Sequence, residues 1–221
     1  MSESIYARAL GGDFERLHPR IQRRFGMSSA AGVAQLGRGV MEEVWRGPPW
    51  TVPFLLLGSW RRILVPKHGH NLPFTIANHA YVDSFGRETV TWSRRFEIGG
   101  REHGFDATMV YSEQRGRIVD YLGTHQHLAV DHAGGLRLRS GEQRFYEGRV
   151  AFRFPMLLTG VADVHEWWDE GEQRFRIEVD VRNRRFGRLF GYRGWFVIEE
   201  SPCAPAAVPS DVRPVREERR E

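Results

Sequence analysis

The stretch GTHQHLAVDH, which begins at residue 123, places three histidines and an aspartate within eight positions. If it forms a β-strand, side chains alternate between two faces, so His125, His127 and Asp131 share one face. Two imidazoles and one carboxylate suit Zn²⁺ or Fe²⁺. The alternative is the solvent-facing side of a strand whose apolar residues, Leu128 and Val130, point inward. We favour this alternative and expect no bound metal, because the sequence offers no fourth ligand.

Polar residues on otherwise apolar strand faces form a second group with chemical potential. In a strand, a charged residue with apolar neighbours two positions away points toward the interior. Five residues fit this pattern or share such a face, and we take them as candidate ligand-binding residues: Trp92, Arg94, Asp120, Glu166 and Tyr192. A buried charge must be paired, so we expect Arg94 to form an ion pair with Asp120 or Glu166. The alternatives are a purely structural salt bridge, or strand faces assigned the wrong way round.

The elements that must position these residues change character at Leu72. Before it, residues 6–26 have helical spacing, residues 31–47 are typical of a first strand, and residues 53–64 indicate a short apolar helix. After it, apolar and polar residues alternate in a series of segments separated by glycine-rich turns. Short connections favour antiparallel neighbours, and a long meander avoids exposed edges by curling.

These patterns predict a mainly β fold with N-terminal helices (α+β). We expect an antiparallel β-barrel or strongly bent sheet of about nine or ten strands, capped by helices and lipocalin-like in architecture. Residues 1–200 are expected to form a single domain, with helices and the first strand in 1–66 and the antiparallel meander in 67–200. The Pro-, Ala- and charge-rich residues 201–221 are expected to be disordered.

Composition excludes several classes of protein. Among 221 residues, 41% are hydrophobic and 27% are charged, and the net charge is +4, which is ordinary for a globular chain. No apolar run approaches the roughly 20 residues of a membrane helix, and the first residues lack the pattern of a secretory signal. The single cysteine, Cys203, permits no internal disulfide. We therefore expect a cytoplasmic location, and we interpret the basic stretch 181–194 as a turn rather than a nucleic-acid surface.

The order of several motifs resembles the bacterial family called domain of unknown function 4166. The similar segments are SIYARALGGDFERLHPRIQRRFG, WRGP, TWSRRFE, RIVDYLG, GGLRLRSGEQRFYEG, HEWWDEGEQRFRIEVDV and GYRGWF, which extend over nearly the whole chain to about residue 200. The positions that match recurrent residues of the family are Trp92, Arg95, Phe96, Gly123, Glu166, Tyr192 and Gly194. The resemblance implies no catalytic residue and no cofactor. The family usually lacks a histidine pair near residue 125, which also disfavours a metal site.

The sequence supports two main hypotheses for the function and a third, weaker one. The first is the binding of an apolar or amphipathic small molecule in the barrel cavity, since such sites combine apolar walls with a few polar groups. The second is an enzyme that uses Glu166 or Asp120 as acid or base, with Arg94 or Tyr192 steadying an oxyanion. A carboxylate with a raised pKa at the cavity wall would favour the enzyme. The third is a domain that only mediates protein contacts. No phosphate-binding, dinucleotide or nucleophile motif is present, so no cofactor is expected.

Overall fold

The structure is a computed structural model that describes residues 3–49, 67–121, 126–140, 145–147, 150–152, 161–183, 187–214 and 217. Its helical segments are α1 (Ile5–Leu10), η1 (Gly11–Arg16), α2 (Pro19–Phe25), η2 (Ser29–Ala31) and η4 (Pro205–Ala207). Its strands are β1 (Val33–Arg46), β2 (Gly69–Val82), β3 (Glu88–Ile98), β4 (Arg101–Ser112), β5 (Arg117–Asp120), β6 (Gln126–Val130), β7 (Leu136–Ser140), β8 (Phe145–Glu147), β9 (Val150–Phe152), β10 (Val161–Asp169), β11 (Arg174–Asn183) and β12 (Gly187–Pro202). The helix predicted over residues 53–64 lies outside the described residues. No helix in the described part of the chain is long and apolar enough to cross a membrane.

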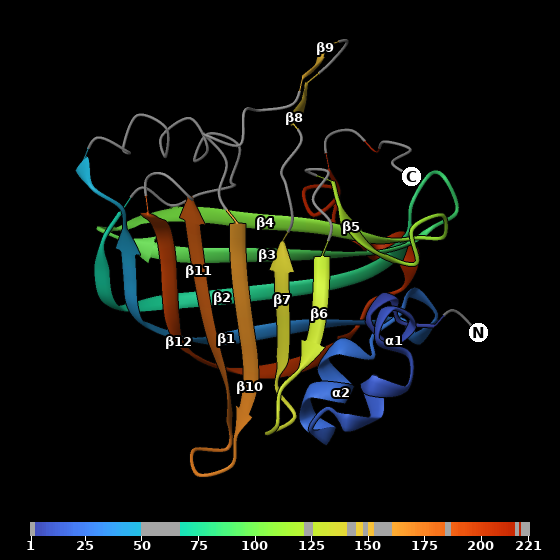
Figure 1. The fold of residues 1–221 in the computed structure, drawn as a ribbon, viewed down its shortest axis with the longest axis horizontal. Helices are drawn as coiled ribbons and strands as arrows, with labels where there is room; N and C mark the ends of the chain where they lie inside the picture. Colours follow the sequence, from blue (N-terminus) through green and yellow to red (C-terminus); the bar gives the residue numbers. More distant parts are fainter. Residues whose placement is uncertain are drawn as a thin grey trace.

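Ten of these strands form one antiparallel sheet in the order β5-β4-β3-β2-β1-β12-β11-β10-β7-β6. Strands β2 to β4 cross the half made by β7, β10 and β11 at a steep angle (Figure 1). The two edge strands, β5 and β6, approach each other, so the sheet is a nearly closed barrel. The predicted antiparallel architecture with N-terminal helices is therefore confirmed, as is a first strand within residues 31–47.

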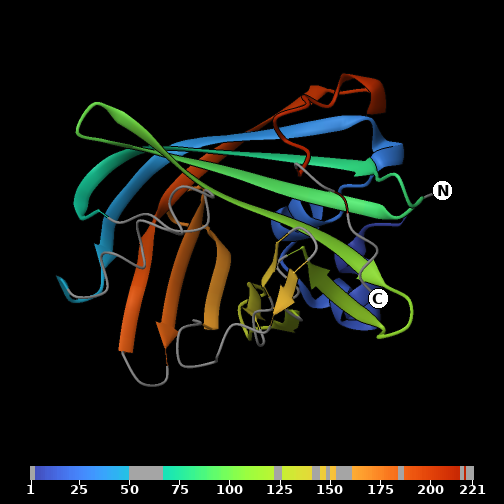
Figure 2. The ribbon, with the colours of Figure 1, turned by 90° about the horizontal axis from the view of Figure 1, so that it is seen from above.

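The sheet bends where β1 and β12 pair. At this bend the two strands lie very close together, which glycines make possible. A Cβ atom on Gly39 would collide with the backbone carbonyl of Trp195, and one on Gly194 would collide with the carbonyl of Val40. The register of β1 against β12 also shifts at residues 41–43, which marks a β-bulge. Bulges and glycines are the usual means by which a strand bends sharply. Both long strands therefore belong to both halves of the barrel, as the view from above shows (Figure 2).

Inward-facing aromatic side chains fill much of the barrel. Because paired residues on neighbouring strands point to the same face, one row of the register crosses six strands. Its members are Trp168, Phe175, Phe196, Gly39, Phe74 and Phe96. The rings of Phe175 and Phe196 are stacked with centroids 5.5 Å apart, and Phe74 lies 5.1 Å from Phe96. The aromatic side chains of this row are therefore part of the hydrophobic core.

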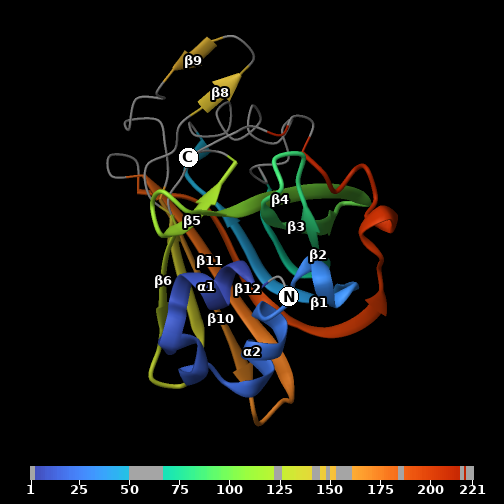
Figure 3. The ribbon, with the colours of Figure 1, turned by 90° about the vertical axis from the view of Figure 1, so that its right-hand side faces the viewer.

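The N-terminal helices lie in front of β10, β11 and β12 and pack into the barrel (Figure 3). Tyr6 of α1 is buried, with its ring 4.9 Å from Phe25 and 6.2 Å from Trp92. Ile21 and Phe25 bury the inner face of α2 by their i, i+4 spacing. A backbone hydrogen bond of 2.9 Å, from His18 to the carbonyl of Gly134, joins α2 to the β6–β7 turn. The helices therefore cap the end of the barrel where the β6–β7 turn lies.

The segment that follows β12 differs from the expectation of a disordered tail. Strand β12 continues to Pro202, and η4 follows directly. Val208 and Val212 are buried against Tyr81, outside the main core. Most of the other described residues in this segment are exposed, so its packing rests mainly on these two valines. Residues 201–214 therefore form part of the packed structure.

Candidate functional site

All five candidate residues point into the barrel, as strand alternation predicted. Trp92 and Arg94 lie on β3, Asp120 ends β5, Glu166 lies on β10 and Tyr192 on β12. Each is buried, and Glu166 and Tyr192 are fully excluded from solvent. The alternation argument therefore placed these side chains correctly.

Glu166 forms an ion pair with Arg24 of α2 and not with Arg94, which was predicted to pair with Asp120 or Glu166. The guanidinium of Arg24 donates to both carboxylate oxygens, with Nε on Oε1 and Nη2 at 3.2 Å from Oε2. Arg24 also donates to Oε1 of Gln35 at 3.4 Å. Helical spacing in the sequence is the signal that indicates a buried Arg24, since Ile21 and Arg24 are three residues apart and lie on the same buried face of α2.

Arg94 is held by uncharged groups. Its Nε donates to the carbonyl of Phe105 at 3.0 Å, and its Nη1 donates to the hydroxyl of Tyr192 at 3.1 Å. The guanidinium also lies 4.0 Å from the centroid of the Phe105 ring and 5.4 Å from that of Trp92. A guanidinium has five N–H donors, so these two hydrogen bonds leave part of its capacity unused.

The charges of Arg24, Arg94 and Glu166 act on the same buried groups. Burial raises the pKa of Glu166, and the two arginines oppose this rise. Burial likewise raises the pKa of Tyr192 and of Tyr6, so both phenols keep their protons at neutral pH. The interior therefore holds one electrostatically coupled cluster, which we call the inner polar cluster: Arg24, Arg94, Glu166, Tyr192 and Tyr6.

Oδ1 of Asn78 on β2 belongs to a nearly fully buried side chain and has no hydrogen-bond partner within the described residues. Asn78 is the direct cross-strand partner of Trp92 on β3. The indole N–H of Trp92 interacts with the hydroxyl of Tyr6 and opposes the rise in the pKa of Tyr6. Buried polar atoms are almost always satisfied in folded proteins, so the unpaired amide oxygen of Asn78 indicates a place for water or for a ligand.

A pocket of about 310 Å³ lies between α2 and strands β1, β10, β11 and β12. We call it the helix–barrel pocket. Arg24 and Gln35, both almost fully buried, lie at its inner side, so it leads to the inner polar cluster. The full lining consists of Arg20, Arg23, Arg24, Gln35, Trp168, Gln173, Phe175, Val197, Ile198 and Glu200. No local sequence pattern indicates this pocket, because its wall combines a helix with strands that are distant in the chain.

The histidine-rich stretch is a strand edge with a tightly held turn. Leu128 and Val130 pack against the core and His127 is exposed, as the second interpretation predicted. Asp131 accepts hydrogen bonds of 2.8 Å from two backbone N–H groups of its own turn and lies 2.6 Å from Nε2 of His165. Burial alone would raise the pKa of Asp131, but these hydrogen bonds outweigh it and hold the pKa below its usual range.

His125 lies outside the described residues. Among the residues that the structure describes, no group of three or more His, Cys, Asp or Glu side chains is arranged to hold a metal. The absence of stoichiometric zinc or iron stays a prediction, and elemental analysis of the gently purified protein tests it.

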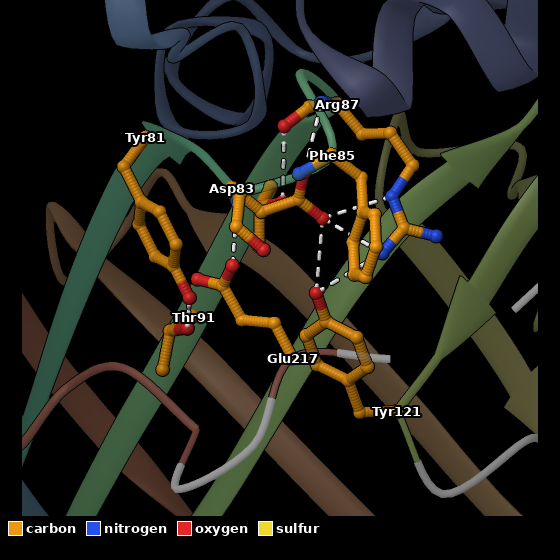
Figure 4. A network of polar contacts seen from close by, with 9 residues as sticks. Tyr81, Asp83, Phe85, Arg87, Thr91, Tyr121 and Glu217 are labelled. Carbon is orange, nitrogen blue, oxygen red and sulfur yellow. Dashed lines mark hydrogen bonds and ion pairs between the residues drawn. The ribbon is translucent and has the colours of Figure 1, made fainter. Parts of the chain in front are cut away.

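A second polar network, shown in Figure 4, fixes the turn between β2 and β3. Asp83 accepts hydrogen bonds from the backbone N–H groups of Phe85 and Arg87, both at 2.9 Å, from the Arg87 side chain, and from Tyr121 at 3.0 Å. Burial would raise the pKa of Asp83, but the hydrogen bonds from Arg87 and Tyr121 hold it below its usual range. Tyr121 directly follows β5, so this network attaches that edge strand to the turn. We interpret it as structural, because its groups satisfy one another.

Fold and interior together define a helix-capped antiparallel β-barrel protein with a buried polar cluster. The chain belongs to the family described as domain of unknown function (DUF4166), whose model matches residues 17–196. It is also 33% identical over 203 residues to the uncharacterized protein YndH of Bacillus subtilis (strain 168), covering 89% of this chain and 98% of that protein. No solved structure matches the chain. The resemblance noted in the sequence is thus confirmed, and the match includes α2 with Arg24.

Proposed function

We propose that this protein binds a small amphipathic molecule at the helix–barrel pocket and the inner polar cluster. The observation that carries the proposal is the buried amide oxygen of Asn78, which has no hydrogen-bond partner within the described residues and lies on the strand next to Trp92 and a coupled cluster of buried charges. Ligand sites of this kind combine mainly apolar walls with a few polar groups that fix the orientation of the ligand.

Arg94 is the residue we propose to hold the polar end of the ligand. Its two described side-chain hydrogen bonds go to the neutral oxygens of Phe105 and Tyr192, and the phenol of Tyr192 is itself protonated. This guanidinium favours an incoming uncharged hydrogen-bond acceptor at the inner end of the ligand, such as a carbonyl oxygen. Trp92, Asp120 and Glu166 complete the proposed lining. In this proposal Glu166 holds Arg24 in place at the inner side of the pocket.

The pocket volume limits the size of the ligand. At about 310 Å³ the helix–barrel pocket is at the lower end of the range for small-molecule sites, roughly 300–1,000 Å³. The molecule is therefore small, with an apolar body that fits between aromatic walls.

The proposed location of the protein is the cytoplasm, which cell fractionation tests.

The experiment begins with native mass spectrometry of the purified full chain, followed by extraction of any bound compound and its rebinding. We expect a compound that rebinds to the native chain and binds at least tenfold more weakly to the Arg94→Met variant. Arg38→Met is the matched control, because Arg38 is exposed and pairs with Glu199 on the outer face. Equal rebinding to both variants, or a chain that takes up no amphipathic compound, contradicts the proposal.

One observation favours a second candidate, an enzyme that uses Glu166 as acid or base. Burial raises the pKa of this carboxyl group, which is a property of catalytic acids and bases. The two candidates differ in what happens to the bound compound. Conversion of the compound by the native chain, abolished in Glu166→Gln while binding persists, supports the enzyme.

A further inference from the structure

We propose that the helix–barrel pocket selects a small organic anion with a flat apolar body, and that Arg20 binds its charged group. This inference rests on the proposed function, since it specifies the chemistry of the ligand. It adds a specificity-determining residue that lies outside the inner polar cluster.

Three arginines of α2 line the pocket together. Arg20, Arg23 and Arg24 follow the i, i+3, i+4 spacing that places side chains on one side of a helix. The helix therefore presents a row of guanidinium groups to a single space of about 310 Å³.

Two of these arginines are already occupied by carboxylates. Arg24 is bound to Glu166. Arg23 donates to both oxygens of Glu200, at 3.2 and 2.6 Å. Each pair neutralises itself, so neither arginine has a full charge to offer a ligand.

Arg20 differs from the other two. Within the described residues it forms no ion pair, and its guanidinium lies 5.2 Å from the centroid of the Trp168 ring. The carboxylate on the adjacent turn, that of Glu170, is engaged elsewhere: it lies 2.9 Å from Nε2 of His18 and accepts a 2.8 Å hydrogen bond from Gln173. Arg20 is thus a cation positioned over an aromatic ring with its N–H donors free for a carboxylate.

The pocket walls determine the shape of the ligand. Trp168 and Phe175 meet edge to face with centroids 4.9 Å apart, and Ile198 adds a further apolar side chain to the lining. A flat apolar ring fits against these surfaces, while its acidic substituent reaches Arg20 at the rim. A neutral molecule of the same shape gains the wall contacts but not the ion pair.

The test compares 1-naphthoate with its neutral analogue 1-naphthamide by isothermal titration of the full chain. We expect naphthoate to bind at least tenfold more tightly than naphthamide, and the preference to weaken as salt is added. In Arg20→Gln, naphthoate should fall to the affinity of naphthamide, which should itself be unchanged. Arg16→Gln is the matched control, because Arg16 is exposed and paired with Asp13. Thermal melts confirm that both variants fold, as expected for exposed side chains.

The outcomes separate the two proposals. Equal affinity for both probes, or a preference for naphthoate that persists in Arg20→Gln, overturns the role of Arg20 and leaves small-molecule binding intact. Failure of both probes to bind at millimolar concentration overturns the inference about this pocket. The proposed function is then tested separately, by comparing how the extracted compound rebinds to the native chain and to Arg94→Met.

Discussion

Replacing Arg24 by methionine tests whether its ion pair with Glu166 lies in a dry interior. The two side chains are 1% and 0% exposed. Removing only the cation leaves a buried carboxylate without its main partner, which costs about 3–5 kcal/mol. For a domain of this size each kcal/mol lowers the Tm by about 2–4 °C, so we expect a fall of roughly 6–20 °C in Arg24→Met.

The pH dependence gives this variant a second signature. Burial raises the pKa of Glu166 in the native protein, and Arg24 opposes the rise. Without Arg24, the pKa of Glu166 in the folded state lies further above its value in the unfolded chain. The folded variant then binds a proton more readily than the unfolded chain, so its stability falls as pH rises. We expect a small penalty near pH 4, where the carboxyl is protonated, and the full penalty at neutral pH.

Urea denaturation followed by tryptophan fluorescence at pH 4 and pH 7.5 measures both effects. Arg23→Met is the control, since the Arg23–Glu200 pair is largely exposed on the arginine side and should contribute less than about 1 kcal/mol. The double variant Arg24→Met/Glu166→Leu should recover most of the loss, because no buried charge remains there. A loss below about 1 kcal/mol for Arg24→Met at pH 7.5 would refute the reasoning and show that water reaches the pair.

Three further changes test other parts of the structure. Gly39→Ala should destabilise the fold by about 1–3 kcal/mol, because the added Cβ meets the backbone of β12. The control Gly12→Ala, with open space around it, should change stability by less than about 0.5 kcal/mol in the same urea titration. The pKa of Asp83 is held below its usual range, so its stabilising effect is present above about pH 4 and is lost as pH falls below that. Asp83→Asn should therefore lower the Tm at pH 7 and bring little change at pH 3; equal losses at both would contradict this. Deleting residues 204–221 should lower the Tm by several degrees, because the deletion removes both valines that pack against Tyr81. Val208→Ala should lower the Tm by less, because it removes only part of that contact. An unchanged melting curve for the deletion would show that this packing does not contribute to stability.

The residues of the interior show which parts of the site could be predicted from sequence. Arg94 and Glu166 were recognised because strand alternation has a period of two, and a charge among apolar neighbours stands out against it. Their pairing was wrong because salt-bridge partners depend on how the helices close the barrel, which local periodicity does not specify. Arg24 lies on a helix, where a period of two does not apply, so the same pattern does not reveal it.

The packing of the last residues was missed for a different reason. Residues 201–214 have the composition of a disordered segment, yet Val208 and Val212 cover Tyr81. Composition averages over a segment, whereas burial depends on whether one or two side chains find a matching surface. Similarly, no local pattern predicts that the first and last strands of the barrel pair with each other, since this contact joins distant parts of the chain.

That pairing has a consequence for the order in which the protein is made. The two central strands of the sheet, β1 and β12, are the first and last strands of the barrel in the sequence. A ribosome releases the chain from its N-terminus onward, so β1 emerges on the order of ten seconds before its partner at ordinary elongation rates. During most of that interval β1 presents an open edge on the side where β12 will pair, and the aromatic residues that β10, β11 and β12 contribute to the row are not yet made. Closure of the barrel is therefore a late, long-range step, which makes slow folding and a need for protection of the nascent chain direct consequences of this topology.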